Sequence, residues 1–186
     1  EQLYELGVRQ FGISYDDLGG SDYYRGQEHA NIINRVNEDF VKVKGDVKPL
    51  IVVATRYCAA WGPDMSYYFT PFYSSLDEDV IVMWTGNATM SVISKSAYEW
   101  PKTQTGVDRD LAAWWNYPVN DYCDGKLLMA PLETVYNDVD NLSGFFLNPM
   151  SQAEASKVAI FSGADYSWNI SDFECMSSWE RAIEEL

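Results

Sequence analysis

The sequence predicts an α/β fold and, within that class, part of a (β/α)8 TIM barrel. Near-continuous apolar strands alternate with helices along the chain, which is typical of a parallel sheet covered by helices. Polar residues fall at the carboxyl ends of successive strands, the edge where barrels present catalytic side chains. These residues are Asp16, Asp17, Tyr57, Trp84, Thr85, Asn116 and Asn148. The chain also lacks the glycine-rich phosphate loop that a doubly wound sheet would carry at its switch point.

Five strands and five further segments account for this pattern. The expected strands cover residues 8–15, 49–57, 79–86, 111–118 and 144–149. Helices are expected over residues 25–45, about 65–75 and 172–186, and from 151 onwards, with a helix or loop over roughly 94–105.

Local signals support three of the helices. Helix 25–45 places Ile33, Val36, Phe40 and Val43 on one face and stops at Gly45. The stretches "SQAE" (151–154) and "SDFE" (171–174) have the form of capping boxes, which predicts that the last two helices begin there.

A complete barrel usually takes about 250 residues, so five strands in 186 residues indicate its C-terminal part. We expect residues 1–170 to belong to the barrel and residues 171–186 to start a following helical region. The chain begins without Met and close to its first strand, which indicates a mature segment or a fragment.

The composition disfavours several classes of ligand and leaves carbohydrates as one candidate. The formal charge is −15, and no basic cluster is present, which disfavours nucleic acids and anionic membranes. No apolar stretch approaches the roughly 20 residues of a membrane span. Seven Trp and thirteen Tyr either fill a core or provide flat surfaces for the apolar faces of sugars.

Metal and triad chemistry are both disfavoured. The three Cys residues match no zinc spacing, and the odd count favours free thiols. His29 is the only histidine and lies within a predicted helix, so a Ser-His-Asp triad is not expected. We therefore expect no metal and no cofactor, and chemistry based on carboxylates, Tyr and Asn.

The pair Asp16-Asp17 has two interpretations. Asp before Gly often ends a strand and starts a turn. Alternatively, both side chains reach one pocket where the strand gives way to a loop, and one ionised carboxylate then raises the pKa of the other. A proton donor beside a fixed anion is what glycoside hydrolysis requires.

The stretch "AWWNYPVNDY" (113–122) favours a sugar site. Of two consecutive Trp residues at a strand end, one ring points inward as a platform and the other outward into the helix layer. Asn116 offers a donor and an acceptor, and Asp121 can accept from hydroxyls. Trp as core, with Asn and Asp as turn residues, is the alternative.

Several motifs together resemble glycoside hydrolase family 84, the bacterial β-N-acetylglucosaminidases, O-GlcNAcases and hyaluronidase-type enzymes. The motifs are "YDD", "NRVNEDFVKVKGDVKPLI", "VMWTG", "AWWNYPVNDY", "FFLNPM" and "ADYSWN". The resemblance runs in order from about residue 8 to the end. It implies strands four to eight of a (β/α)8 catalytic domain, followed by the start of a helical region.

The resemblance also implies a retaining, substrate-assisted mechanism in which the acetamido oxygen of N-acetylglucosamine attacks C1. Asp16 would hold the acetamido N–H, Asp17 would be the general acid and then base, and Tyr57 would bond near the acetamido group. Trp114 would form the pocket wall and Asn116 would help to hold the acetamido group. Asp121 and Asn148 would grip sugar hydroxyls.

Departures from the family pattern leave alternatives open. Arg56 stands where an acidic residue is expected, and either meets an anionic leaving group or, as we favour, faces solvent. The loop "DDLGGSDYYRG" is richer in Gly and Tyr than expected, so the leaving-group side differs. A catalytically incomplete carbohydrate-binding relic remains an alternative, as does a hydrolase with a carboxylate nucleophile.

The resemblance implies N-acetylglucosamine-containing glycans or glycoproteins as ligands. The missing N-terminal half of the barrel, or a second copy of the chain, is the expected protein partner, because half a barrel has an open sheet edge. We expect a secreted or cell-surface bacterial protein, although this chain contains no targeting segment.

Overall fold

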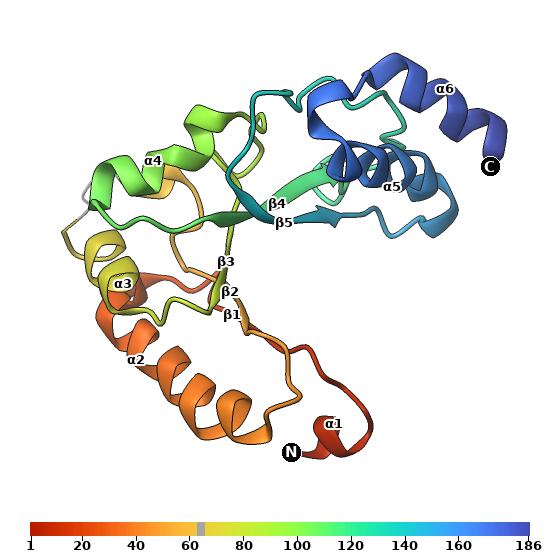
Figure 1. Cartoon of the computed structure of the whole chain (residues 1–186). Helices are drawn as coiled ribbons and strands as arrows, with labels where there is room; N and C mark the ends of the chain where they lie inside the picture. Colours follow the sequence, from red (N-terminus) through yellow and green to blue (C-terminus); the bar gives the residue numbers. More distant parts are fainter. Residues whose placement is uncertain (63–65) are drawn as a thin grey trace.

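A computed structural model describes residues 1–62 and 66–186 of the chain. Its five strands form one parallel sheet in the order β1-β2-β3-β4-β5 (Figure 1). The strands are β1 (Gly12–Ser14), β2 (Ile51–Val53), β3 (Ile81–Trp84), β4 (Leu111–Pro118) and β5 (Leu142–Asn148). Sequential order has no reversal point, so the sheet is arranged as consecutive strands of a barrel are and differs from a doubly wound sheet.

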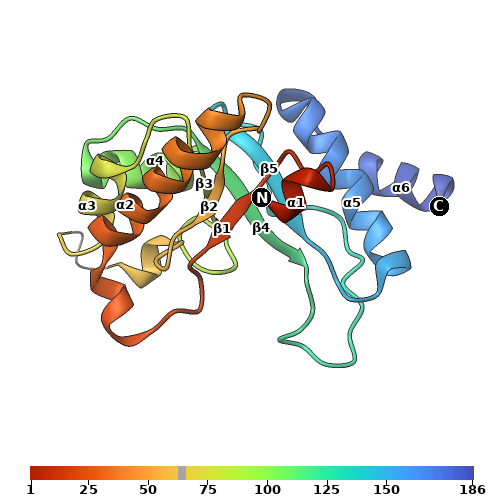
Figure 2. The same ribbon diagram turned by 90° about the horizontal axis from the view of Figure 1, so that it is seen from below.

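Five of the helices gather in two groups beside the sheet. Helices α2, α3 and α4 accompany the first strands, whereas α5 and α6 pack on each other beside β4 and β5 (Figures 1 and 2). The helices are α1 (Gln2–Glu5), α2 (Gly26–Val36), α3 (Phe69–Ser75), α4 (Lys95–Thr105), α5 (Ala153–Trp168) and α6 (Cys175–Glu185). Further helical segments, of 3-10 or π type, are η1 (Gly20–Tyr24), η2 (Asn37–Lys42), η3 (Ala59–Trp61) and η4 (Ile170–Asp172).

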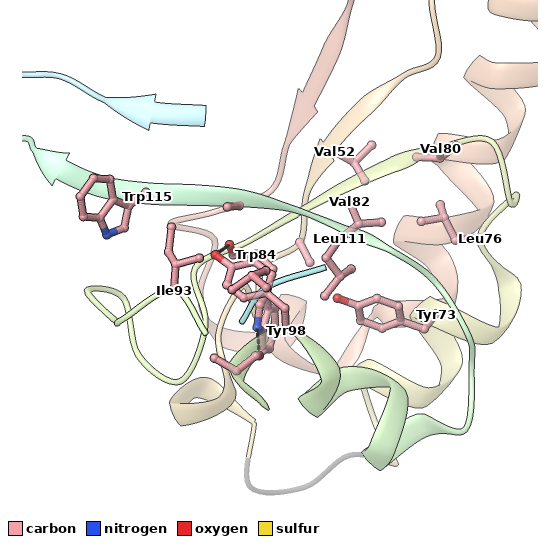
Figure 3. Close-up of a cluster of buried hydrophobic side chains, with 14 of the residues drawn as sticks. Val52, Tyr73, Leu76, Val80, Val82, Trp84, Ile93, Tyr98, Leu111 and Trp115 are labelled. Atoms are coloured by element: carbon pink, nitrogen blue, oxygen red, sulfur yellow. Dashed lines mark hydrogen bonds between the residues drawn. The ribbon is translucent and has the colours of Figure 1, made fainter. Parts of the chain in front are cut away.

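Strand alternation sends side chains to two different faces of the sheet. Val52, Trp84 and Trp115 enter the main core between sheet and helices, which Figure 3 shows with Tyr98 of α4. The neighbouring residues Val53 and Trp114 instead belong to a small second cluster on the opposite face. Because successive side chains in a strand point to opposite faces, this second face is the inner surface of the incomplete barrel.

Both edge strands of the sheet have a single neighbour among the described residues, since β1 pairs only with β2 and β5 only with β4. Helix α6 packs on α5. The boundary at residue 170 between barrel and helical region stays a prediction.

The helix expected over residues 25–45 forms, but part of its predicted apolar face was wrong. Asn37–Lys42 adopt a π-helix, which has more residues per turn than an α-helix. The wider turn changes which side chains face inward, so that Val41 is buried and Val43 is 73% exposed.

Both predicted capping boxes were also wrong. Helix α5 begins after Gln152, which makes no side-chain capping bond, and Ser151 plays no part. Helix α6 begins later than residue 172, and Glu174 caps it directly by accepting from the backbone N–H groups of Met176 and Ser177. The helix expected from about residue 65 is α3, which begins at Phe69, and residue 65 itself lies outside the described residues.

Candidate active site

A cavity of about 450 Å³ opens at the carboxyl ends of the strands. It is lined by Asp16, Asp17, Tyr57, Thr89, Met90, Trp114, Asn116, Val119, Asp121, Tyr122 and Asn148. All seven residues predicted from the sequence are in this set, although they lie up to 132 positions apart in the chain, from Asp16 to Asn148. The strand order explains the convergence, because the carboxyl ends of parallel strands meet at one edge of the sheet.

A larger hollow of about 630 Å³ lies at the other end of the sheet, around Val80 and Arg109. The Arg109 guanidinium donates there to the carbonyl oxygens of Leu76, Asp77 and Val80. Those bonds tie the segment before β4 to the segment before β3, which gives the arginine in this hollow a structural role.

The acidic pair lies on a turn that follows β1. Asp17 adopts a left-handed conformation, with φ at 59°, which Asp tolerates better than most residues. Asp16 is half-buried and accepts a hydrogen bond from the Ser14 hydroxyl, whereas Asp17 is exposed. The turn interrupts strand alternation, which is how two adjacent side chains both line the cavity. The two interpretations of this pair are therefore compatible.

Tyr57 and Trp114 form an aromatic wall. Their ring centroids are 5.3 Å apart at an interplanar angle of 64°, an edge-to-face arrangement. Burial raises the pKa of the Tyr57 phenol, and a hydrogen bond with the Thr89 side chain opposes that rise. The phenol is therefore protonated at neutral pH and can donate a hydrogen bond to a ligand.

Asn116 and Asn148 are fixed by each other across β4 and β5. Asn148 Nδ2 donates to Asn116 Oδ1 at 3.0 Å, and Asn116 Nδ2 donates to the Thr89 carbonyl at 2.7 Å. Asn116 is 8% exposed, so these bonds satisfy an amide that would otherwise be costly to bury. The chain of bonds joins the loop after β3 to both C-terminal strands.

Four cavity residues were missed by the sequence reasoning: Thr89, Met90, Val119 and Tyr122. Tyr122 directly follows Asp121, so the loop position was a usable signal. Thr89 and Met90 come several residues after the end of β3, beyond the strand-end positions Trp84 and Thr85 that the sequence pattern indicated.

Trp84 and Thr85 lie at the end of β3 as expected, but they do not line the cavity. Trp84 is fully buried in the main core, where its Nε1 donates to the Ala97 carbonyl, and the Thr85 hydroxyl donates to the Ala88 carbonyl. Arg56 was expected to face solvent, yet it is only 7% exposed. Its guanidinium donates to the carbonyl oxygens of Tyr23 and Trp61, so its partners are backbone groups of two loops.

Within residues 1–62 and 66–186, no group of three or more His, Cys, Asp or Glu residues is arranged to hold a metal ion. None of the helices described there has the length and apolar character needed to cross a membrane.

Known proteins resemble this chain over its full length. A family model described as beta-N-acetylglucosaminidase (NAGidase) matches residues 1–186. The structure of CpGH84B is 38% identical with a TM-score of 0.90, and covers 98% of this chain and 33% of that chain. The structure of CpGH84D is 34% identical with a TM-score of 0.85, covering 99% of this chain and 30% of that chain.

A variant of the Thermobaculum terrenum O-GlcNAc hydrolase is 25% identical, with a TM-score of 0.84, and covers 98% of this chain and 41% of that chain. This chain thus spans about a third of the length of the solved structures it matches. The predicted fold class, part of a (β/α)8 barrel, is confirmed, and so is the resemblance on which it partly rested.

Proposed function

The chain belongs to the β-N-acetylglucosaminidase family, and from this premise we propose that it carries the acid–base part of a glycosidase site. The site removes terminal β-linked N-acetylglucosamine from glycans or glycoproteins by a retaining, substrate-assisted mechanism. The observation that carries the proposal is the single cavity lined by an acidic pair, an aromatic wall and two amides.

In the first step, Asp17 protonates the leaving oxygen as the bond between that oxygen and C1 breaks. The acetamido oxygen of the substrate forms the new bond to C1, which gives an oxazolinium ion that keeps its N–H proton and needs no protein nucleophile. In the second step, Asp17 takes a proton from water, the water oxygen bonds to C1, and the bond between C1 and the acetamido oxygen breaks. Two inversions at C1 give retention, and general acid–base help of this kind contributes about 10²–10⁴-fold.

Asp16 and Tyr57 act on the acetamido group. The Asp16 carboxylate accepts from the acetamido N–H, which orients that group and stabilises the positive charge that develops on it. Asp16 is half-buried and already held by the Ser14 hydroxyl, so its carboxylate is positioned before substrate binds. The protonated Tyr57 phenol donates a hydrogen bond close to the reacting group.

The sugar ring is held from the β4 and β5 side. Trp114 packs beside the acetamido group as a wall of the pocket, and Asn116 positions Asn148 through their hydrogen bond. Asn148 and the exposed Asp121 bind the sugar hydroxyls, since amides and carboxylates accept from them.

Hydrolysis of 4-methylumbelliferyl β-N-acetylglucosaminide tests the proposal, with the whole protein that contains this chain and with the chain alone. We expect turnover by the whole protein and far less by the chain alone, which spans about a third of its relatives. NMR of the first product should show the β anomer, as retention requires.

Two results would contradict the proposal. Release of the α anomer would exclude a retaining mechanism. A whole protein that binds N-acetylglucosamine without hydrolysing the glycoside would support a carbohydrate-binding relic instead.

A further inference from the structure

Trp61 lies beside the cavity with 41% of its surface exposed. It ends the short helix η3, and its ring centroid is 6.1 Å from that of Tyr57. Its indole Nε1 donates to the Thr89 hydroxyl at 3.2 Å. Because Tyr57 and Thr89 both line the cavity, the indole borders the site without forming part of its lining.

The position of this indole is fixed from several sides. Tyr23 stacks on it, with ring centroids 6.1 Å apart and planes 12° from parallel. The buried Arg56 joins the two loops by donating to the Tyr23 carbonyl at 3.0 Å and to the Trp61 carbonyl at 2.9 Å. At Gly62 a Cβ would lie 1.8 Å from the Phe69 ring, so the next residue must be glycine. A surface held in this way binds a ligand with little loss of side-chain entropy.

The same surface lies on the leaving-group side of the site. Tyr23 belongs to η1, in the loop that begins at Asp17, the proposed general acid. The residues proposed to grip the sugar lie towards the opposite edge of the sheet, where Asn148 ends β5 and Asp121 follows β4. A substrate with its terminal sugar held there directs its leaving group past Asp17 towards Trp61.

The chemistry of this surface suits a neutral ring. Tyr24 is 60% exposed and Tyr67 56% exposed, with their rings in edge contact at 5.7 Å. The nearby Arg56 is turned inward with 7% exposure, and the exposed Arg25 that follows Tyr24 has its charge paired with Asp22 at 3.8 Å. Flat aromatic faces suit the apolar C–H face of a pyranose, whereas an anionic group would need an available positive charge.

We propose that Trp61, supported by Tyr23 and Arg56, forms a subsite for the second sugar of a glycan, so that the leaving group is carbohydrate. This inference rests on the proposed function, because it takes the cavity to hold the terminal N-acetylglucosamine. It adds the substrate class: glycans with N-acetylglucosamine β-linked to another sugar.

Calorimetric binding to the whole protein carrying Asp17→Asn tests this inference while hydrolysis is suppressed. The probes are methyl β-N-acetylglucosaminide, a disaccharide with N-acetylglucosamine β-linked to galactose, and a peptide with N-acetylglucosamine on serine. We expect the disaccharide to bind about tenfold more tightly than the methyl glycoside, and Trp61→Ala to abolish that difference. A tenfold change corresponds to about 1.4 kcal/mol.

Two further variants show whether the flat ring of Trp61, its hydrogen bond to Thr89 or the mere loss of a tryptophan changes the affinities. Trp61→Phe keeps a flat ring without the bond to Thr89, so it should retain most of the preference for the disaccharide. Trp168→Ala removes a tryptophan that is 90% exposed at the end of α5 and should change none of the three affinities.

Each failure has its own signature. If the methyl glycoside does not bind, the proposed function fails and this inference fails with it. If it binds but the disaccharide binds no more tightly, or Trp61→Ala weakens both equally, the subsite is excluded and the function stands. If Trp61→Ala weakens only the glycopeptide, the surface binds peptide and the inference is wrong.

Discussion

The two ends of the cavity hold their polar side chains in different ways. At the β4–β5 end, the largely buried Asn116 is locked between Asn148 and the Thr89 carbonyl. At the β1 end, Asp17 is exposed and lies on a left-handed turn, beside a half-buried Asp16 that is held by one serine hydroxyl. One end is a fixed hydrogen-bond network on strands, and the other is a loop.

This difference matches the two tasks that the proposed mechanism assigns. Binding a sugar gains from groups that are already in place, since ordering them later would cost entropy. A general acid that later acts as base must exchange protons with a leaving group and with water, so exposure at the rim suits it. Substitutions at the two ends should therefore have different effects on the kinetic parameters.

Substitution of the acidic pair should give the largest effects. In the whole protein, Asp17→Asn should lower kcat/KM about 10²–10⁴-fold for substrates with poor leaving groups, because only these need protonation. Activated aryl glycosides should lose much less. Asp16→Asn should lower kcat for both substrate types, because both need the oriented acetamido group.

Steady-state kinetics on a matched pair, an alkyl and a dinitrophenyl β-N-acetylglucosaminide, distinguish these signatures. Asp39→Asn is a suitable control, since Asp39 is an exposed helical residue whose side chain pairs with Arg35, far from the cavity lining. Equal losses on both substrates in Asp17→Asn would remove the general acid role from that residue.

At the opposite end the test is a double-mutant cycle in kcat/KM. Asn116→Ala and Asn148→Ala should be strongly non-additive, with a coupling free energy of about 0.5–3 kcal/mol, because each amide positions the other. Asn148→Ala combined with Asp121→Ala should be closer to additive, since no hydrogen bond among the described residues joins those two side chains. Additive behaviour of the asparagine pair would mean that their hydrogen bond does not preorganise this end.

Sequence reasoning was most successful where alternation within one strand decides the outcome. The strand 111–118 formed with the expected bounds, with Trp114 on the inner face and Trp115 in the core. The hydrogen bond between Asn116 and Asn148 was not predicted, because it depends on how β4 and β5 pair across a long loop.

Contacts between loops were the hardest to predict. An arginine next to a strand end resembles a solvent-exposed residue, and only the folded loops show that Arg56 binds the carbonyls of Tyr23 and Trp61. The π-helix at Asn37–Lys42 was missed for a similar reason. An apolar pattern read with α-helical spacing cannot show that the turn widens.

The smallest predicted effect concerns His29, which packs next to the acidic pair at the β1 end of the cavity. His29 stacks on Tyr15, the residue before the acidic pair, with ring centroids 4.3 Å apart, and its Nδ1 lies 3.1 Å from the Tyr68 hydroxyl. That hydroxyl already accepts from the Thr55 N–H at 2.9 Å, so its proton is free to be donated to Nδ1 of a neutral imidazole. The other ring nitrogen, Nε2, lies 3.8 Å from Asp22.

Burial lowers the pKa of His29, with the Asp22 carboxylate acting in the opposite direction. The unfolded chain, in which His titrates near pH 6.5, therefore binds more protons than the folded chain below about that pH. The free energy of unfolding should fall as the pH drops through about 6.5, and the stability that the neutral imidazole contributes is fully lost below the pKa of His29 in the folded chain.

Unfolding of the whole protein and of its His29→Gln variant, at about pH 7.5 and about pH 5, measures this pH dependence. The decrease should be larger in the protein with His29, and an equal decrease in both would show that the imidazole does not titrate differently on folding. Because the two proteins differ only at residue 29, any such difference belongs to the β1 end, while the asparagine network at the other end contains no group that titrates in this range.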